Sequence, residues 1–599
     1  MRLFDPRQNL KQTKSAYLIL ALVLCFLLLP GLFLRDFWVR GEGRRVLIAL
    51  EMVQGGDWLV PDLMGEPILT KPPLFYWLEA LSLKMTGGPS DWAARLPSLL
   101  AAIACALSLA VMIDRLLGRR AAVLAGLMLA VALVFHGIAQ SCEPEIVLVA
   151  SGTLALMCFV KGLVGDGPVR RWVLPFYLFI LLSFMSKGPV MPLIIILTVV
   201  LFCLLTKNTP LLKPMGSWLG LTVLFVPLII WLLCLEVRMN AISKITQELG
   251  VHLEGDAPHS KEFTYYFDTL NKLTFPWAFW LYFAPFFSLC SEWKGGEGVF
   301  TQLFRRLRQY CLQGRGERLL LVLWFLVSIL TLSVIPSKRY YYGLILAPPV
   351  IALAAMLFND WLASGLPRLW AFLSRYRRVL MGALALVSLI LLLIGFLTTI
   401  PPEIEEYDGR STLDDKTLFL FGGVWTLGII GILWLKSDDQ HGEKVFRNSM
   451  WWLLTCMMGL VTIYNVLLSP RMNESYSLKK AANELMESLP AEGAELFTFR
   501  ATHALCFYLG RPDLPYISDS EELKEYLENH PNALGIVYRK IGKRLKINRD
   551  SISYMSHELS PRRERIIGST YFGSHRNPSP EKVKVEVCAC SSTRRIIHR

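Results

Sequence analysis

Residues Arg40 to Trp77 read RGEGRRVLIALEMVQGGDWLVPDLMGEPILTKPPLFYW and follow the first hydrophobic run of the chain. The stretch is too polar to lie inside a bilayer, yet apolar residues recur at three- and four-residue steps from Val46 to Val53. This period indicates a helix with one apolar face, which suits the surface of a membrane. We expect Gly55-Gly56 to end this helix and Pro72-Pro73 to begin the next element.

The sequence around this stretch is that of a membrane protein. Of 599 residues, 53% are hydrophobic and 18% are charged, whereas soluble proteins carry roughly a quarter charged residues. The apolar residues form blocks close to the ~20 residues that a bilayer requires, and only a helix pairs its backbone groups within such a block. We therefore predict a polytopic α-helical protein. Its thirteen candidate spans lie at about 16–34, 94–113, 120–139, 146–164, 172–187, 189–206, 216–236, 276–292, 318–335, 341–358, 379–400, 416–436 and 450–468.

Lysine and arginine are concentrated in alternate loops, as in DRLLGRR and FRRLRQYCLQGRGER. Because basic loops stay in the cytoplasm, this pattern places the N-terminus there and, with an odd number of spans, exports residues 470–599. The first hydrophobic run lacks a small-residue cleavage site, so we interpret it as an anchor. A multi-pass protein of the cell membrane is expected.

The charge and the cysteines narrow the function further. The net charge of +14 reflects the basic loops and a basic C-terminal tail, which attract anionic lipid, and no nucleic-acid-binding motif accompanies it. The twelve cysteines lie mostly within the spans, where they act as small apolar residues. No Cys/His spacing typical of a metal site is present.

The chain divides at about residue 470. Residues 1–469 are expected to form the membrane domain, with long exported loops at 35–93 and 237–275. Residues 470–599 indicate a small α/β domain, because SLKKAANELMESL and SEELKEYLENH have helical patterns and ELFTF, ALGIVYR and KVEVCAC are rich in β-formers. We find no repeat between the halves of the chain, which disfavours common transporter plans.

Charged residues at the exported ends of the spans are the candidates for chemistry. Each is costly if it faces lipid, and snorkelling to headgroups is the alternative for any single one. Several carboxylates and cations around one cavity suit a substrate that bears phosphate, because the cations bind the phosphate and a carboxylate acts as a base or a metal ligand. The candidates are Glu42, Arg44, Arg45, Lys71, Glu143, Glu145, Lys187, Lys338 and Arg339.

Several motifs resemble one bacterial family, in order along the chain. The stretch quoted above is similar to a pattern that reads W-x-x-D-E-x-R-Y, then E-M-x-x-x-G-D-W-x-V-P, then N-G-x-P-x-x-x-K-P-P. SCEPEIVLV, FMSKGPV, HSKEFTYYFDTLNKLTFPW, PSKRYYYGLILAPP and LCFYLGRP follow, so the matches span Trp38 to Pro512. The family includes the aminoarabinose transferase that acts on lipid A. It resembles protein O-mannosyltransferases and belongs to the C-type, polyprenyl-phosphate-sugar-dependent glycosyltransferases.

The resemblance implies a C-type (GT-C) fold, with interfacial helices in the first exported loop and a periplasmic C-terminal domain. It also implies that a sugar passes from a polyprenyl phosphate to a hydroxyl of a glycolipid or a protein at the periplasmic face. A carboxylate takes the acceptor proton while cations, sometimes with a divalent metal, stabilise the departing phosphate. The expected partners are the lipid-linked donor, the acceptor and membrane lipids. We expect a monomer in the inner membrane that binds no nucleic acid.

The resemblance assigns roles in the first exported loop position by position. Lys71 in TKPP matches the family lysine that binds the lipid phosphate, and Glu42 and Arg44 match the Glu and Arg of D-E-x-R. The family aspartate before that glutamate is Gly41 here, and the following tyrosine is Arg45. The base role is therefore assigned to Glu42, and phosphate binding to Lys71 with both arginines.

Further candidates come from two later motifs. Glu145 is expected to be the second carboxylate of the site, with Glu143 as runner-up. Lys338, Arg339 and Tyr342 match an S-K-R-x-x-Y region that lines the phosphate site.

The match is less clear for a histidine and for a metal site. His252 is a candidate for a further phosphate contact, although Val251 fits the alignment equally well. The family's metal-binding glutamate before the lysine is Thr70 here, and Leu249 falls closest to its partner histidine. We therefore predict no metal ligands and no required cofactor, while a divalent cation stays compatible with the reaction.

Two other functions are compatible with part of the pattern. A transporter or flippase of lipid-linked intermediates would place charged residues deep within spans, together with inverted repeats and broken helices. An inactive relative that binds lipid-linked sugar is suggested by Gly41 and Thr70. The charged residues at one membrane face, beside an amphipathic loop, favour the glycosyltransferase.

Overall fold

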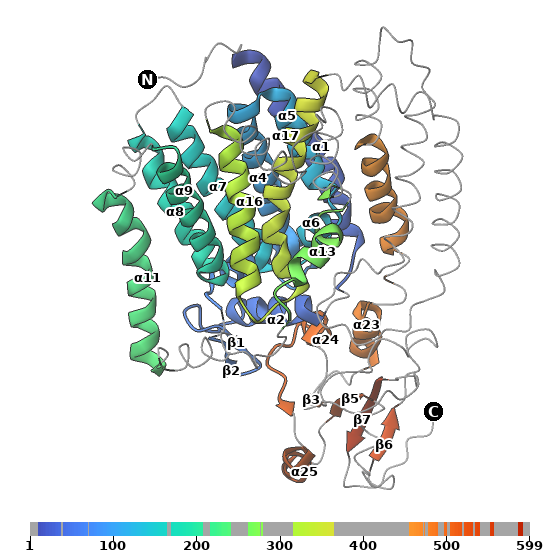
Figure 1. Cartoon of the computed structure of the whole chain (residues 1–599). Coiled ribbons are helices and arrows are strands. Elements are labelled where there is room, and N and C mark those ends of the chain that lie inside the picture. Colours follow the sequence, from blue (N-terminus) through green and yellow to red (C-terminus); the bar gives the residue numbers. More distant parts are fainter. Residues whose placement is uncertain are drawn as a thin grey trace.

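The computed structural model is a helical bundle with one helix lying across its lower end and a small sheet beyond that helix (Figure 1). The structure describes residues 10–37, 40–69, 71–164, 169–207, 216–240, 243, 261–275, 277–278, 316–364, 454–470, 473, 477–488, 496–499, 503–517, 520–530, 534–538, 552–555 and 585–590.

Six helices in the described residues are long and apolar enough to cross a membrane, and a bent pair would be a seventh. The six are α1 (Leu10–Leu34), α4 (Asp91–Leu117), α7 (Pro144–Val164), α11 (Trp218–Met239), α16 (Glu317–Val334) and the continuous run of η2 (Tyr340–Leu346) and α17 (Ala347–Ser364). The bent pair is α5 (Arg119–Ala130) with α6 (Leu133–Ala139), and further helices are α8 (Arg170–Lys187), α9 (Val190–Leu205) and Leu454–Val466.

These helices fall at the predicted spans wherever both can be compared. The spans predicted at 379–400 and 416–436, and nearly all of 276–292, lie outside the described residues. The count of thirteen therefore stays a prediction, whereas a mostly helical chain with several membrane-crossing helices is what the structure shows.

The span predicted at 120–139 is interrupted by a bend of 66° between α5 and α6. The bend frees the carbonyl of Ala130, which accepts a hydrogen bond from His136 Nδ1 at 3.1 Å. The other ring nitrogen of this buried histidine lies 2.9 Å from Gln140 Nε2 and 3.2 Å from Asn465 Nδ2. His136 thus donates at one nitrogen and accepts at the other, and the bend leaves this carbonyl paired.

Helix α2 (Arg40–Val53) is the helix that the opening stretch predicts, and it lies across the lower end of the bundle (Figure 1). Its residues Val46 to Leu50 are buried. Gly55 follows the helix with a φ of +109°, a backbone conformation that favours glycine. Helix α2 contacts both α3 (Leu74–Thr86) and α24 (His503–Tyr508), so it is covered on more sides than a helix at a membrane surface would be.

A short hairpin lies between α2 and α3. Strand β1 (Asp62–Leu63) pairs antiparallel with β2 (Glu66–Pro67), and Gly65 in the turn has a φ of +83°. Before the hairpin, Asp57 forms an ion pair with Arg238 at the end of α11. The segment between α2 and α3 is therefore linked to a helix far away in the sequence.

The C-terminal region contains a five-stranded mixed sheet of order β4-β3-β5-β7-β6. Its elements are α23 (Lys479–Ser488), β3 (Leu496–Phe499), β4 (Tyr516–Ile517), α25 (Ser520–Asn529), β5 (Leu534–Tyr538), β6 (Ile552–Met555) and β7 (Val585–Cys590). β3 pairs in parallel with β4 and β5, with Leu496 opposite Leu534, and β7 pairs antiparallel with β5 and β6. The strands predicted from ELFTF, ALGIVYR and KVEVCAC and both predicted helices are present, whereas β4 and β6 were not predicted.

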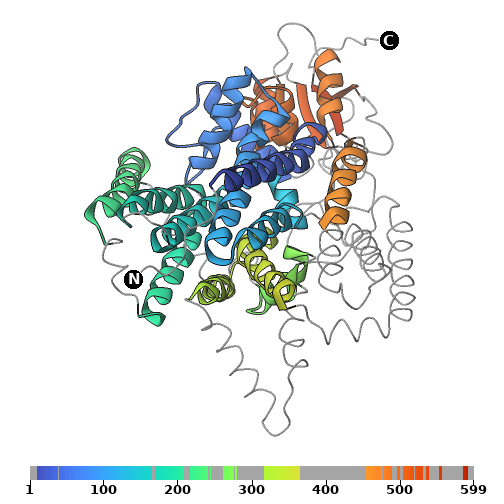
Figure 2. The same cartoon turned by 90° about the horizontal axis from the view of Figure 1, so that it is seen from above.

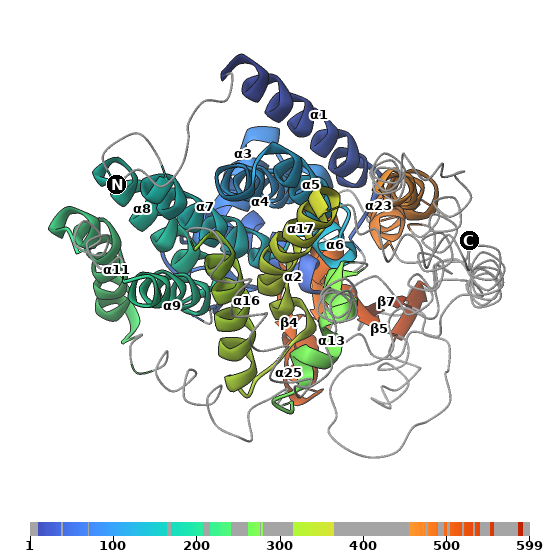
Figure 3. The same ribbon diagram turned by 45° about the horizontal axis from the view of Figure 1, so that its top comes forward.

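The view from above shows the blue N-terminal helices between green α11 and the orange C-terminal elements (Figure 2). Helix α11 lies at the edge of the bundle and contacts α8 (Figure 3), and α13 (Tyr265–Thr274) lies against η2 and α6. Helices α7 and α9 begin, and α8 ends, at the end of the bundle that faces α2. The candidate residues gather at that end.

Candidate functional site

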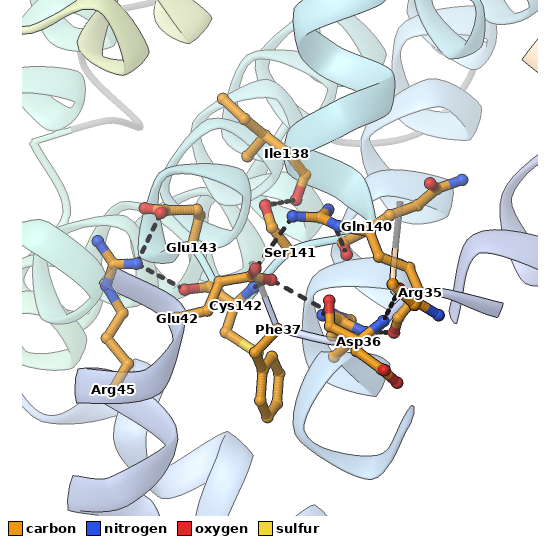
Figure 4. Close-up of polar contacts among 12 residues, drawn as sticks. Arg35, Asp36, Phe37, Glu42, Arg45, Ile138, Gln140, Ser141, Cys142 and Glu143 are labelled. Atoms are coloured by element: carbon orange, nitrogen blue, oxygen red, sulfur yellow. Dashed lines mark hydrogen bonds and ion pairs between the residues drawn. The ribbon is translucent and has the colours of Figure 1, made fainter. Parts of the chain in front are cut away.

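An ion pair between α2 and the turn before α7 lies at the centre of the candidate site (Figure 4). Arg45 Nη1 lies 2.6 Å from Glu143 Oε1 and donates a hydrogen bond to the Cys142 carbonyl at 2.8 Å. Burial works against the charge of Arg45, but the Glu143 carboxylate outweighs it and raises the pKa of Arg45. Glu143 Oε2 has no hydrogen-bond partner among the described residues. The pair therefore offers a carboxylate with one oxygen fixed and one free.

Lys71 is a half-buried lysine in the loop before α3. It forms no hydrogen bond and no ion pair with any residue that the structure describes. Burial, followed by the charge of Arg45, lowers the pKa of Lys71 to about 7. Arg44 and Arg339 add to this effect, whereas Glu143 opposes it. A cluster of cations around a single carboxylate attracts an anion.

Lys187, the last residue of α8, pairs with Glu145 in the first turn of α7. Its ammonium lies 3.8 Å from the ring centroid of Tyr342 and 4.9 Å from that of Tyr341, which is a cation–π arrangement. Lys71 is close enough to Lys187 to repel its charge. This pair and the two tyrosines therefore border the same cluster.

The residues before η2 form another border of the cluster. Arg339 Nη1 lies 2.6 Å from the hydroxyl of Tyr341, to which it donates, and the Tyr266 hydroxyl on α13 donates to the Arg339 carbonyl at 3.1 Å. Lys338 has a different contact, because its Nζ donates to the Lys261 carbonyl at 3.1 Å. The structure therefore places Arg339 in the cluster and Lys338 outside it.

Glu42, which the sequence analysis assigns as the base, lies in a neighbouring ion cluster (Figure 4). Its Oε2 accepts a hydrogen bond from Arg35 Nη2 at 3.0 Å. Its Oε1 accepts from Arg95 Nε and from the Cys142 backbone N–H, each at 3.3 Å. The side chain is 0% exposed. Both oxygens of Glu42 are thus engaged in an enclosed place, whereas Glu143 keeps one oxygen free.

Gly41 lies against the Arg45 guanidinium. A Cβ at this position would be 3.1 Å from Arg45 Nη1, so any larger side chain would require the guanidinium to shift. The two departures from the family pattern, at positions 41 and 45, are therefore adjacent in space. Arg45 uses the room beside the glycine and reaches Glu143.

Glu79 is a buried acid that the sequence analysis missed. It is 0% exposed on α3, and neither carboxyl oxygen has a hydrogen-bond partner among the described residues. Burial raises the pKa of Glu79 well above its ordinary value, while Arg45 and the Cys142 thiol oppose this effect. The nearby Glu143 carboxylate raises the pKa of Glu79 further. A lone acid in the apolar run LFYWLEALSL was the signal that could have identified it.

The predicted site residues fall into three groups. Those that the structure brings into one cluster are Arg44, Arg45, Lys71, Glu143, Glu145, Lys187, Arg339 and Tyr342. Glu42 and Lys338 have the separate contacts described above. His252 and Thr70 lie outside the described residues.

The donor atoms of the cluster suit an anion better than a metal ion. In the described part of the chain, no group of three or more His, Cys, Asp or Glu side chains is arranged to hold a metal. Glu143 and Glu145 each offer one free oxygen. Each of these carboxylates is already paired with a cation, and further cations lie around them. These cations would attract a phosphate group.

Comparison with known proteins gives related results from sequence and from structure. The dolichyl-phosphate-mannose-protein mannosyltransferase family matches residues 70–233. The undecaprenyl phosphate-alpha-4-amino-4-deoxy-L-arabinose arabinosyl transferase of Aeromonas salmonicida is 26% identical over 427 residues, 70% of this chain and 72% of the relative. The corresponding transferase 2 of Proteus mirabilis is 24% identical over 462 residues, 76% of each chain.

The fold has a solved counterpart. The crystal structure of ArnT from Cupriavidus metallidurans bound to undecaprenyl phosphate superposes with a TM-score of 0.67 and 19% identity, over 97% of this chain and 98% of that chain. At this identity the likeness establishes the fold, which is the C-type glycosyltransferase fold that the sequence analysis predicted.

Proposed function

We propose that this chain, which is ArnT-like and has the C-type (GT-C) membrane glycosyltransferase fold, transfers a sugar from a polyprenyl-phosphate donor to an acceptor hydroxyl. The observation that carries the proposal is the unpaired ammonium of Lys71 within a group of arginines, beside the free oxygen of Glu143. These are the two kinds of group that transfer from a phosphate ester requires.

The cations of the cluster bind the donor phosphate. Lys71 approaches it as a point charge, while the guanidinium groups of Arg44 and Arg339 can each donate two hydrogen bonds. The phosphate becomes more negative as its bond to the anomeric carbon breaks. Cations held in place beside this phosphate therefore stabilise the transition state more than the bound donor.

Glu143 is the base in this proposal. As the acceptor oxygen forms its bond to the anomeric carbon, the hydroxyl proton passes to Glu143 Oε2. The bond between that carbon and the phosphate oxygen breaks, and the phosphate leaves with the electron pair. Arg45 holds the other carboxylate oxygen and orients Glu143.

Glu42 positions the site, because both of its oxygens are engaged by Arg35, Arg95 and the Cys142 backbone. The assignment of Glu42 as the base stays a prediction that the experiment below compares with Glu143. Glu145, paired with Lys187 beneath Tyr342, orders the far border of the cluster.

The relatives suggest the substrates. Undecaprenyl-phosphate-linked 4-amino-4-deoxy-L-arabinose is the donor that their names give, and we take it as the first donor to test. A lipid A-type glycolipid or a protein hydroxyl is the acceptor. The chain would act as a monomer in the inner membrane, with a cytoplasmic N-terminus, a membrane domain at 1–469 and a periplasmic domain at 470–599. The comparisons give no support to a flippase.

The proposal is tested with the full-length protein in lipid nanodiscs, supplied with that donor and a lipid A acceptor. The measured quantity is the release of undecaprenyl phosphate. We expect Glu143→Gln to lower kcat by roughly 10²- to 10⁴-fold, as the loss of a general base does. The donor KM should change little, because the cations remain. Glu66→Gln, an exposed glutamate in β2, is the matched control and should behave as wild type.

Two results would contradict parts of this proposal. Near-normal turnover in Glu143→Gln, together with loss of turnover but not of stability in Glu42→Gln, would return the base role to Glu42. Failure of the wild-type protein to release polyprenyl phosphate from any polyprenyl-phosphate sugar would overturn the proposed function itself.

A further inference from the structure

The segment LCFYLGRP, residues 505–512, has no role in the chemistry described so far. In the structure its first half belongs to α24, which packs directly against α2. The contact is made at Gly43, where a Cβ would lie 2.5 Å from the backbone nitrogen of Ala504. Because the obstacle is backbone, a change of rotamer cannot relieve it. Gly43 therefore permits α24 to touch the helix that carries Arg45.

The same segment holds the chain before α2. The backbone N–H of Phe37 donates to the Tyr508 hydroxyl at 2.9 Å. The Phe37 ring packs against Phe507 and Tyr508, with centroid distances of 5.3 and 5.6 Å. The Arg95 guanidinium lies 4.6 Å from the same ring centroid. Phe37, 2% exposed, is thus enclosed between the C-terminal region and α4.

Two more residues of the C-terminal region bind this chain segment. Asn473 Oδ1 accepts the N–H of Asp36 at 3.0 Å, and its Nδ2 donates to the Leu34 carbonyl at 2.9 Å. Lys479 Nζ lies 2.5 Å from Asp91 Oδ2 at the start of α4 and 3.9 Å from Asp36 Oδ1. Residues 34–37 are therefore held from two sides: by Asn473 and Tyr508 of the C-terminal region, and by Arg95 on α4, which donates to the Arg35 carbonyl and, at 2.8 Å, to the Asp36 carbonyl.

A continuous series of contacts leads from this anchor to the candidate base. Arg35, in the anchored segment, binds Glu42 on α2. Glu42 in turn accepts the N–H of Cys142, the residue before Glu143 (Figure 4). The Arg35 guanidinium also donates to the carbonyl of Gln140 at 3.1 Å. The turn that carries Glu143 is thus held through residues 35–42, which the C-terminal region holds.

We infer that this C-terminal anchor, Asn473 and α24 with Tyr508, is part of the catalytic apparatus and positions Glu143 for proton transfer. Tyr508 and Gly43 are positioning residues, because they touch neither substrate nor reacting atoms. This inference rests on the proposed function. The inference distinguishes proton transfer from donor binding. The anchor acts on Glu143, which takes the proton, whereas Lys71, which binds the donor, lies on a different loop.

The test uses the full-length protein in lipid nanodiscs with the undecaprenyl-phosphate-sugar donor. Tyr508→Phe removes the acceptor of the Phe37 N–H and keeps the aromatic packing. We expect kcat to fall about tenfold and the donor KM to stay unchanged, because small displacements of a catalytic group are costly. Gly43→Ala should lower kcat about a hundredfold. Gly459→Ala is the matched control, because nothing lies within 4 Å of a Cβ there, and its kinetics should equal those of wild type.

A second measurement, hydrogen exchange, is independent of the substrate. Tyr508→Phe should speed amide exchange in peptides that cover residues 35–53 and leave other helices unchanged. Unchanged exchange there, or a rise in KM equal to the fall in kcat, would overturn the inference. A third outcome is faster exchange in Tyr508→Phe together with no sugar transfer by the wild-type protein. This outcome would overturn the proposed function, but the structural contact between α24 and residues 35–53 would stand. Tyr508→Phe alone decides the matter if Gly43→Ala does not fold.

Discussion

The charge of Lys71 depends on its burial and on the charged groups around it. Its pKa of about 7 arises from burial and from the arginines around it. A bound phosphate would supply the missing negative charge and restore the protonated form. Because a phosphate offsets the repulsion among these cations, the cluster favours a phosphate over a neutral lipid.

This predicts a pH dependence of donor binding. The pKa of Lys71 is lowered in the folded protein, so the burial penalty on its charge is complete below pH 7 and fades as pH rises toward the ordinary value. Donor binding weakens as the pH rises above 7, because Lys71 in the free enzyme loses the positive charge that attracts the phosphate. The donor KM should rise up to about tenfold per pH unit between pH 7 and 9. Lys71→Arg, which keeps its charge, should show little of this rise, and an equal slope in both proteins would remove Lys71 from the phosphate site.

At the residue scale, the sequence predicted which charged residues gather in the candidate cluster better than it predicted their ion pairs. Charged residues at helix ends identified Lys71, Arg45 and Glu143, because such groups are rarely placed beside lipid without a purpose. The pairing of Glu42 with two arginines could not be predicted, since one of them, Arg95, lies 53 positions away on α4. A charge list does not distinguish an enclosed carboxylate from a free one.

At the scale of the element, the bend between α5 and α6 is stabilised by His136 and by the side-chain amides of Gln140 and Asn465. Asn465 lies in a π-helical turn, donates to the Leu27 carbonyl at 3.0 Å and contacts His136. Wide turns of this kind often mark places where a helix adapts to function. The polar group here joins α1, α6 and the helix Leu454–Val466 in the interior of the bundle.

We therefore expect Asn465→Leu to destabilise the protein by about 1–3 kcal/mol, because it removes the hydrogen bonds of Asn465 to the Leu27 carbonyl and to His136 in an apolar interior. Thermal unfolding in detergent measures the change. Thr462→Val is the matched control, since the Thr462 hydroxyl bonds to Met458 on its own helix, and its effect should be smaller. Equal stability of Asn465→Leu and wild type would show that the network is not structural.

Helices and strands were predicted where the sequence shows a hydrophobic pattern, and were missed where it shows none. Helix α2 followed from the apolar steps between Val46 and Val53. The bend at 120–139 has no such sign, because a segment that is apolar on all sides looks the same whether straight or broken. Strands β3, β5 and β7 were evident from β-formers, whereas β4 has only two residues and depends on its neighbour β3.

Charged side chains lie at both ends of the described bundle. The cluster around Lys71, the C-terminal sheet and α2 lie at one end of the bundle (Figure 1). The other end carries Asp114, Arg115 and Lys161, near the ends of α4 and α7. Which end faces the cytoplasm stays a prediction from the positive-inside pattern of the sequence.

Labelling with a membrane-impermeant maleimide tests the predicted orientation. Glu521→Cys, exposed on α25, should react in intact spheroplasts, because the C-terminal region is expected to be exported. Lys207→Cys, exposed after α9, should react only after permeabilisation. Wild type gives the background of native thiols. The reverse result would place the Lys71 cluster in the cytoplasm.

The contact between α24 and α2 also has a consequence in time. Phe37 and Tyr508 are 471 positions apart, and a ribosome that adds roughly 5–20 residues per second needs roughly 25 to 95 seconds to make the chain between them. During that interval α24 has not been synthesised, so α2 lacks this packing partner. If the anchor positions Glu143 as proposed, a nascent or truncated polypeptide lacks it, and we expect only the finished, fully inserted molecule to consume lipid-linked sugar.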